Sequence, residues 1–123
     1  MKTKLTITLD DAASIMTAAL SAARGSGASI SIAIVDDAGV LIAFQRMPEA
    51  RGYTAELAQQ KARVSAQVGV PSAAIQAAGR SDATAGGVPI KTDGQIVGAI
   101  GVSGASTQVD VRIAEAGIAA WAG

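Results

Sequence analysis

The chain has 123 residues, and its ten basic residues are balanced by ten acidic ones, with no histidine and no cysteine. This length fits a single domain spanning residues 1–123. The missing residue types exclude Cys/His zinc sites, iron–sulfur clusters, disulfides, thiol nucleophiles and a Ser-His-Asp triad. Zero net charge without a basic cluster also argues against nucleic acid as a partner.

Half of the residues are apolar, but nearly half of that share is alanine and only 2% of residues are aromatic. Small side chains each bury little area, at roughly 25 cal/mol per Å², so we expect extra burial in a homo-oligomer of two or more copies. No stretch approaches the roughly 20 apolar residues of a membrane span, and Asp10 and Asp11 follow too soon for an apolar signal sequence. We therefore expect a cytoplasmic protein with no membrane contact.

The first half of the chain predicts a helix followed by a hairpin. Thr8 and Asp11 have the spacing of a capping box, and apolar residues recur at helical spacing from Leu9 to Ala23. Glycines at 25 and 27 end that helix. Residues 30–35 and 40–46 then alternate as strands around the turn-forming sequence at 36–39. Both faces of the second strand carry apolar residues, which predicts a sheet covered on both sides.

The second half repeats this order less clearly. A loop at 47–52 leads to a helix over about 55–67, in which Ala58, Ala62 and Ser65 form a stripe of small residues suited to close packing on a sheet or a partner helix. Residues 72–78 favour a short helix, and 79–87 a loop. Strands at 88–91 and 95–103 follow, and Thr107 with Asp110 resembles a second capping box before the last helix. With a short strand at 3–7, this order predicts an α+β class with an antiparallel sheet.

Several residues stand out as carriers of chemistry. Arg46 at a strand end has the fork geometry that pairs with a carboxylate, although periodicity alone favours a solvated arginine whose stem covers apolar surface. Tyr53 is either a phenol donor or iron ligand, or a half-buried anchor of its loop. Glu56 and Lys61 on the second helix are candidates for moving a proton, if burial shifts the pKa of either group toward neutrality. The common alternatives are a dipole-stabilising acid and an ordinary surface lysine.

The paired glycines Gly86 and Gly87 precede a rigid Pro89. Such a sequence allows unusual backbone angles, and exposed amides there would form an anion-binding nest. A hinge into an edge strand explains the same residues, because proline is confined to strand starts and edges. No grouping of acids calls for a metal ion.

Taken in order, the sequence strings of this chain resemble the GlcG/HbpS family, also found as the C-terminal domain of PduO-type proteins. The strings that carry the resemblance cover nearly the whole chain: residues 5–12, 32–47, 58–62, 86–90 and 96–105, followed by Asp110 and Ala114. The resemblance implies a profilin-like fold, a five-stranded antiparallel sheet with helices on both faces. It also implies homo-oligomers and an association with haem binding, possible haem degradation, and operons for cobalamin or small acids.

The absence of histidine sets this chain apart from the usual discussion of haem binding in that family. An iron ligand here would be Tyr53, a methionine or a weak oxygen donor, so haem is one cofactor to consider and no cofactor is certain. We expect a small-ligand-binding protein of the GlcG/HbpS type with a small anionic partner. The alternative is a small cofactor-independent enzyme acting on an organic acid, an isomerase, lyase or hydrolase.

The ligand-binding residues expected from the sequence share one predicted pocket. They are Arg46, Tyr53, Glu56, Lys61, Gly86, Gly87 and Pro89. In the enzyme alternative Arg46 holds a carboxylate, while Lys61 or Glu56 moves a proton.

Overall fold

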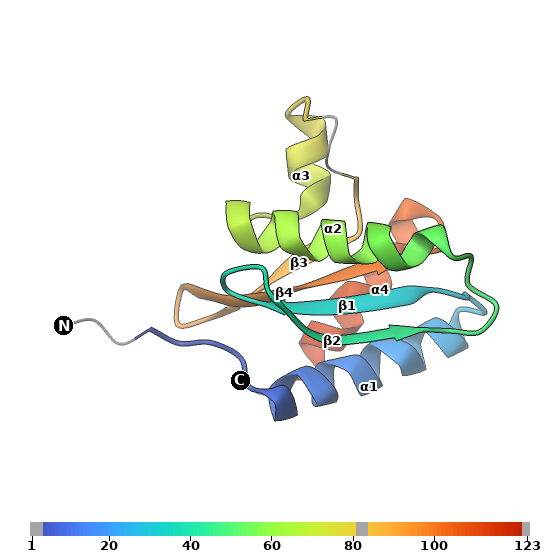
Figure 1. The fold of residues 1–123 in the computed structure, drawn as a ribbon, viewed down its shortest axis with the longest axis horizontal. Helices are drawn as coiled ribbons and strands as arrows, with labels where there is room; N and C mark the ends of the chain where they lie inside the picture. The colour runs from blue at the N-terminus through green and yellow to red at the C-terminus, as the bar shows by residue number, and fades with distance from the viewer. Residues whose placement is uncertain (1–3, 81–83, 122–123) are drawn as a thin grey trace.

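Two β-hairpins form one antiparallel sheet, and each hairpin feeds a helix (Figure 1). The computed structural model describes residues 4–80 and 84–121. The elements in chain order are α1 (Leu9–Gly25), β1 (Ser31–Asp36), β2 (Leu41–Arg46), α2 (Tyr53–Val68), α3 (Ser72–Ala77), β3 (Gly87–Thr92), β4 (Gln95–Ser103) and α4 (Thr107–Ala119). The strand order is β2-β1-β4-β3, so the two hairpins meet where β1 pairs with β4. The α+β class is confirmed.

The sheet of the described residues has four strands, so the expectation of five is wrong in its count. The missing strand is the one expected at 3–7, of which residue 3 lies outside the described residues. Ile7 donates one backbone hydrogen bond to the carbonyl of Val97, at 3.1 Å. The backbone of Leu5 instead reaches the side chain of Gln95, and Thr8 already caps α1. One ladder bond holds this segment beside β4 without making it a strand.

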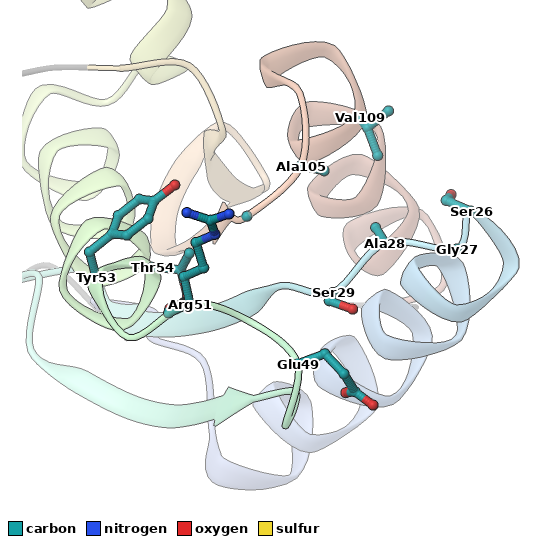
Figure 2. A pocket seen from close by; sticks show the side chains of 11 residues that line it. Ser26, Gly27, Ala28, Ser29, Glu49, Arg51, Tyr53, Thr54, Ala105 and Val109 are labelled. Carbon is teal, nitrogen blue, oxygen red and sulfur yellow. Dashed lines mark hydrogen bonds between the residues drawn. The ribbon is translucent and has the colours of Figure 1, made fainter.

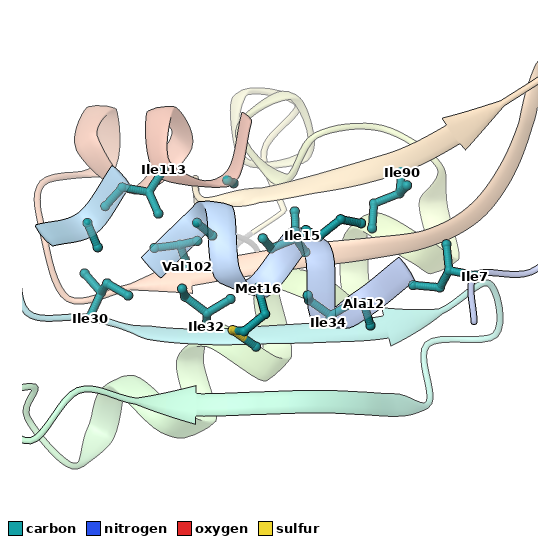
Figure 3. Packing of buried hydrophobic residues seen from close by; sticks show 14 of the residues in the cluster. Ile7, Ala12, Ile15, Met16, Ile30, Ile32, Ile34, Ile90, Val102 and Ile113 are labelled. Carbon is teal, nitrogen blue, oxygen red and sulfur yellow. The ribbon is translucent and has the colours of Figure 1, made fainter. Parts of the chain in front are cut away.

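Helices cover both faces of the sheet, as expected, with α2 on one side and α1 and α4 on the other (Figure 1). Alternation along β1 assigns its side chains: Ile32 and Ile34 join the core under α1 and α4, whereas Ala33 and Val35 face α2. Isoleucine side chains therefore dominate the core between the sheet and helices α1 and α4, around Ile15 of α1 (Figure 3). The layer under α2 is built almost entirely from alanine.

The small residues of α2 let its backbone lie directly on the sheet. Ala58, Ala62 and Ser65 are fully buried against the strands, so this stripe serves packing within the chain rather than packing of a partner helix. A methyl group at Gly101 of β4 would overlap the carbonyl oxygen of Ala58 and lie 2.6 Å from the amide nitrogen of Ala62. Only a glycine permits this approach.

The helix starts test the two expected capping boxes. The first is confirmed, because Asp11 N–H donates to Thr8 Oγ1 at 3.1 Å and Thr8 N–H to Asp11 Oδ2 at 2.9 Å. The second is wrong: Ser106, not Thr107, caps α4, its Oγ accepting from Val109 N–H. Asp110 does not complete a capping box, because its buried carboxylate accepts hydrogen bonds from Lys61 and from the Ala105 amide.

Candidate functional site

A hollow of about 410 Å³ opens at one end of the sheet, where three connections meet. These connections are α1 to β1, β2 to α2, and β4 to α4 (Figure 2). Loops that meet at one end of a rigid sheet are a common place for binding residues. The lining residues are Ser26, Gly27, Ala28, Ser29, Glu49, Arg51, Tyr53, Thr54, Gly104, Ala105 and Val109.

Arg51 and Tyr53 supply the chemistry of this hollow. Tyr53 is the first residue of α2 and is 64% exposed, and Arg51 is also exposed. Arg51 projects from the connection just before α2 and Tyr53 from the first residue of α2, whereas Glu49 points away from them (Figure 2). A guanidinium binds a carboxylate through two parallel hydrogen bonds, and a phenol donates or accepts one. The opposite wall, formed by the connection at 26–29, offers small side chains and backbone.

Side-chain bonds to the backbone hold the connection that carries these two residues. Arg46 donates through Nη1 to the carbonyl of Ala50 at 2.9 Å. Thr54 donates through Oγ1 to the carbonyl of Arg51 at 2.6 Å, and its oxygen lies 2.8 Å from Ser31 Oγ. Since the Thr54 hydroxyl hydrogen is used, Ser31 is the donor in that buried pair. The start of α2 is thereby tied to the first residue of β1.

Lys61 lies behind this hollow and not in it. Its side chain is 3% exposed, and Nζ donates to the carbonyl of Val102 at 2.8 Å and to Asp110 Oδ2 at 3.1 Å. Burial lowers the pKa of Lys61 and raises the pKa of Asp110, and the attraction between the two charges opposes both shifts. An ammonium enclosed in this way is poorly placed to move a proton of a substrate, so the geometry does not favour the enzyme alternative.

The glycine pair is buried against Lys61. A methyl group at Gly86 would lie 2.8 Å from Lys61 Nζ, and one at Gly87 would overlap the backbone carbonyl of Lys61. The amide of Gly87 donates to Ser72 Oγ at 2.8 Å. These contacts explain the glycines by close packing with α2 and β4 and place the pair out of solvent, which differs from the exposed amides of the anion-nest alternative; ligand binding by this pair stays a prediction. Pro89 is buried on β3, an edge strand, as its chemistry requires.

The structure thus brings together Lys61, Gly86 and Gly87, and separately places Tyr53 on the hollow. Arg46 and Glu56 are exposed and do not line the hollow. Ligand binding by the predicted set stays a prediction. Sequence reasoning missed Arg51, because the loop at 47–52 has no periodicity that distinguishes one charged residue from another. Its place after a strand and before a helix was the available signal.

The fold defines the class of the protein. It is an α+β domain with helices on both faces of an antiparallel sheet and a hollow between the loops at one end. The family described as haem degrading protein HbpS-like matches residues 7–119. Protein GlcG of Escherichia coli strain K12 is 36% identical over 114 residues, covering 84% of this chain and 85% of that protein. The chain therefore belongs to the HbpS-like family, and its resemblance to GlcG and HbpS is confirmed.

Solved structures agree with this assignment. A double mutant of HbpS from Streptomyces reticuli has 28% identity and a TM-score of 0.86, covering 97% of this chain and 89% of that one. A PduOC:heme complex has 24% identity and a TM-score of 0.85, covering 94% and 95%, and supports the fold alone. Within residues 4–80 and 84–121, no helix is both long and apolar enough to cross a membrane. The expected cytoplasmic location stays a prediction.

Proposed function

We propose that this protein binds a carboxylate-bearing tetrapyrrole, with haem as the first ligand to test, in the hollow lined by Arg51 and Tyr53. The observation that carries the proposal is the exposure of a guanidinium and a phenol at the mouth of one hollow. A tetrapyrrole offers carboxylates to the first group and a flat apolar ring to the second. The family description names haem, and the PduOC structure contains heme.

The residues of the hollow can be compared with what haem requires, which is a ligand for the iron and a cation for the propionates. With no histidine or cysteine in the chain, the usual haem-iron ligands that remain are tyrosine and methionine. Tyr53 is on the hollow, whereas Met47 is half-buried and packed against the core under α1. Arg51 provides the cation for a propionate. The residues present therefore fit a haem held through a phenolate and a guanidinium.

The roles of the residues follow from this fit. Arg51 would hold and orient a carboxylate, and Tyr53 would place its oxygen as the iron ligand or stack its ring on the macrocycle. Ala28, Ala105 and Val109 would supply apolar contact at the opposite side. Haem, when bound, supplies redox-active iron. The fixed connection before α2 keeps both ligand-binding side chains in place, because Arg46 and Thr54 fasten its carbonyls.

Titration with haemin and with metal-free protoporphyrin IX tests the proposal. Wild-type protein should give saturable changes in the Soret band with both. Arg51→Ala should weaken binding of both by about 10- to 150-fold, the range for a lost charge-assisted hydrogen bond. Tyr53→Phe should alter the haemin spectrum while leaving the protoporphyrin affinity nearly unchanged. Arg63→Ala, an exposed arginine of α2 that does not line the hollow, is the matched control.

The outcomes separate the parts of the proposal. Loss of haemin affinity in Arg51→Ala, but not in Arg63→Ala, supports the site. An unchanged haemin spectrum in Tyr53→Phe removes the phenolate ligand from the proposal. If the wild-type protein saturates with neither tetrapyrrole, the proposed function is wrong.

A further inference from the structure

The buried pair of Lys61 and Asp110 joins three separate parts of the chain. Lys61 Nζ on α2 reaches the carbonyl of Val102 on β4, at 2.8 Å, and Asp110 Oδ2 on α4, at 3.1 Å. The other carboxylate oxygen, Oδ1, accepts the backbone N–H of Ala105 at 3.0 Å. Lys61 is 3% exposed and Asp110 2%, so these bonds lie out of water. The carboxylate thus holds the turn between β4 and α4 from behind.

That turn is one wall of the hollow. Gly104 and Ala105 both line it, next to the amide that Asp110 holds. Gly104 has φ +134°, and a methyl group there would lie 2.6 Å from the carbonyl oxygen of Ser29. The turn is therefore pressed against the connection at 26–29, which forms another wall. A shift of the turn would change two walls of the hollow together.

We propose that Asp110 and Lys61 are positioning residues of the ligand site: the carboxylate, held by the ammonium, sets the Gly104–Ala105 wall through the Ala105 amide. The proposal rests on the proposed function, because it assigns these residues to the same hollow. Neither side chain lines the hollow, so neither is expected to touch a ligand. Their effect on binding passes through the backbone of the turn.

A purely structural role is the competing explanation. Removing one partner of a buried ion pair leaves an uncompensated charge and destabilises the whole domain, which would weaken any binding site. Replacing both partners by groups without charge avoids that penalty. Two double variants therefore separate positioning from stability.

Lys61→Met with Asp110→Asn keeps a side-chain oxygen for the Ala105 amide, whereas Lys61→Met with Asp110→Leu removes it. Both variants lose the Lys61 bond to Val102 equally. We expect both to fold with similar Tm. Hydrogen exchange of the Ala105 amide should accelerate about ten-fold in the leucine variant relative to the asparagine variant. Haemin, or protoporphyrin IX if only that binds, should bind about ten-fold more weakly to the leucine variant.

The proposal is supported if the leucine variant loses both the protection of the Ala105 amide from hydrogen exchange and the affinity for the probe, while the asparagine variant keeps both. Equal probe affinity of the two variants overturns it while leaving the proposed function intact. Equal exchange of Ala105 in the two variants overturns the claim that the carboxylate holds the turn, whatever the probe does. If wild-type protein binds neither probe, the proposed function fails and this positioning role fails with it.

Discussion

Gly101→Ala offers the sharpest test of how α2 is seated on the sheet. The added methyl group would overlap the carbonyl oxygen of Ala58 and lie 2.6 Å from the amide nitrogen of Ala62. Ordinary van der Waals contact begins near 3.4 Å, so the helix backbone must move away by more than 1 Å at the Ala58 carbonyl. The atoms in the way belong to helix backbone, which cannot rotate aside as a side chain can. We therefore expect a cost at the upper end of overpacking, about 3 kcal/mol.

Thermal unfolding measures this cost. For a chain of this size 1 kcal/mol corresponds to about 4 °C in Tm, so Gly101→Ala should lower the Tm by about 12 °C. Gly25→Ala is the matched control, because it lies in the last turn of α1 and an added methyl would meet nothing within 4 Å. That control should leave the Tm unchanged or raise it slightly. A Gly101→Ala protein that melts within about 2 °C of wild type would refute the reasoning.

Three further predictions concern acid stability, the loop before α2 and assembly. Hydrogen bonds from the Thr8 amide and the Trp121 indole hold the pKa of Asp11 below 3.8, so its stabilisation is complete above that pH and is lost as the pH falls through the lowered pKa. As the pH falls from about 5 to about 2, the Tm of Asp11→Asn should fall less steeply than the Tm of wild type. The control Asp10→Asn keeps both hydrogen bonds to Asp11, so its Tm should follow that of wild type. Arg46→Ala should release the Ala50 carbonyl and weaken haemin binding at little cost in Tm, since the side chain is exposed; equal binding would exclude a role in fixing the loop. Light scattering at micromolar concentration should give at least twice 12.1 kDa, and a monomer would contradict the expected oligomer.

Much of the fold follows from local patterns in the sequence. The alternation in residues 30–35 and the helical spacing after Thr8 each depend on neighbours a few positions apart, so both elements were predictable. The start of α2 was set two residues late, at 55 instead of Tyr53, because Gly52 and Tyr53 give no strong capping signal. The strand expected at 3–7 is wrong because a strand needs a series of backbone hydrogen bonds to its neighbour, here β4. The residue pattern of 3–7 does not show whether those bonds form.

The site was harder to predict because its contacts join distant residues. Lys61 and Asp110 are 49 positions apart, and nothing in either local sequence indicates that they meet. Lys61 was expected either on the surface or at a ligand, yet it is buried as a bridge between α2, β4 and α4. The sequence marks the glycines at 86 and 87 but not the reason for them: a Cβ atom at Gly86 would meet the Val102 carbonyl oxygen and the Lys61 side chain, and one at Gly87 would meet the Lys61 backbone.

The same close packing explains how so small a core can hold the walls of the hollow firmly. Where α2 meets β3 and β4, backbone lies on backbone, so few large side chains are needed to fix the helix. The walls of the hollow are then set by bonds to backbone groups: Arg46 to Ala50, and Asp110 to Ala105. Side chains that face the hollow take no part in these two bonds. We therefore expect that Arg51 and Tyr53 can be replaced without loosening the walls, so that the proposed ligand binding can be varied separately from stability.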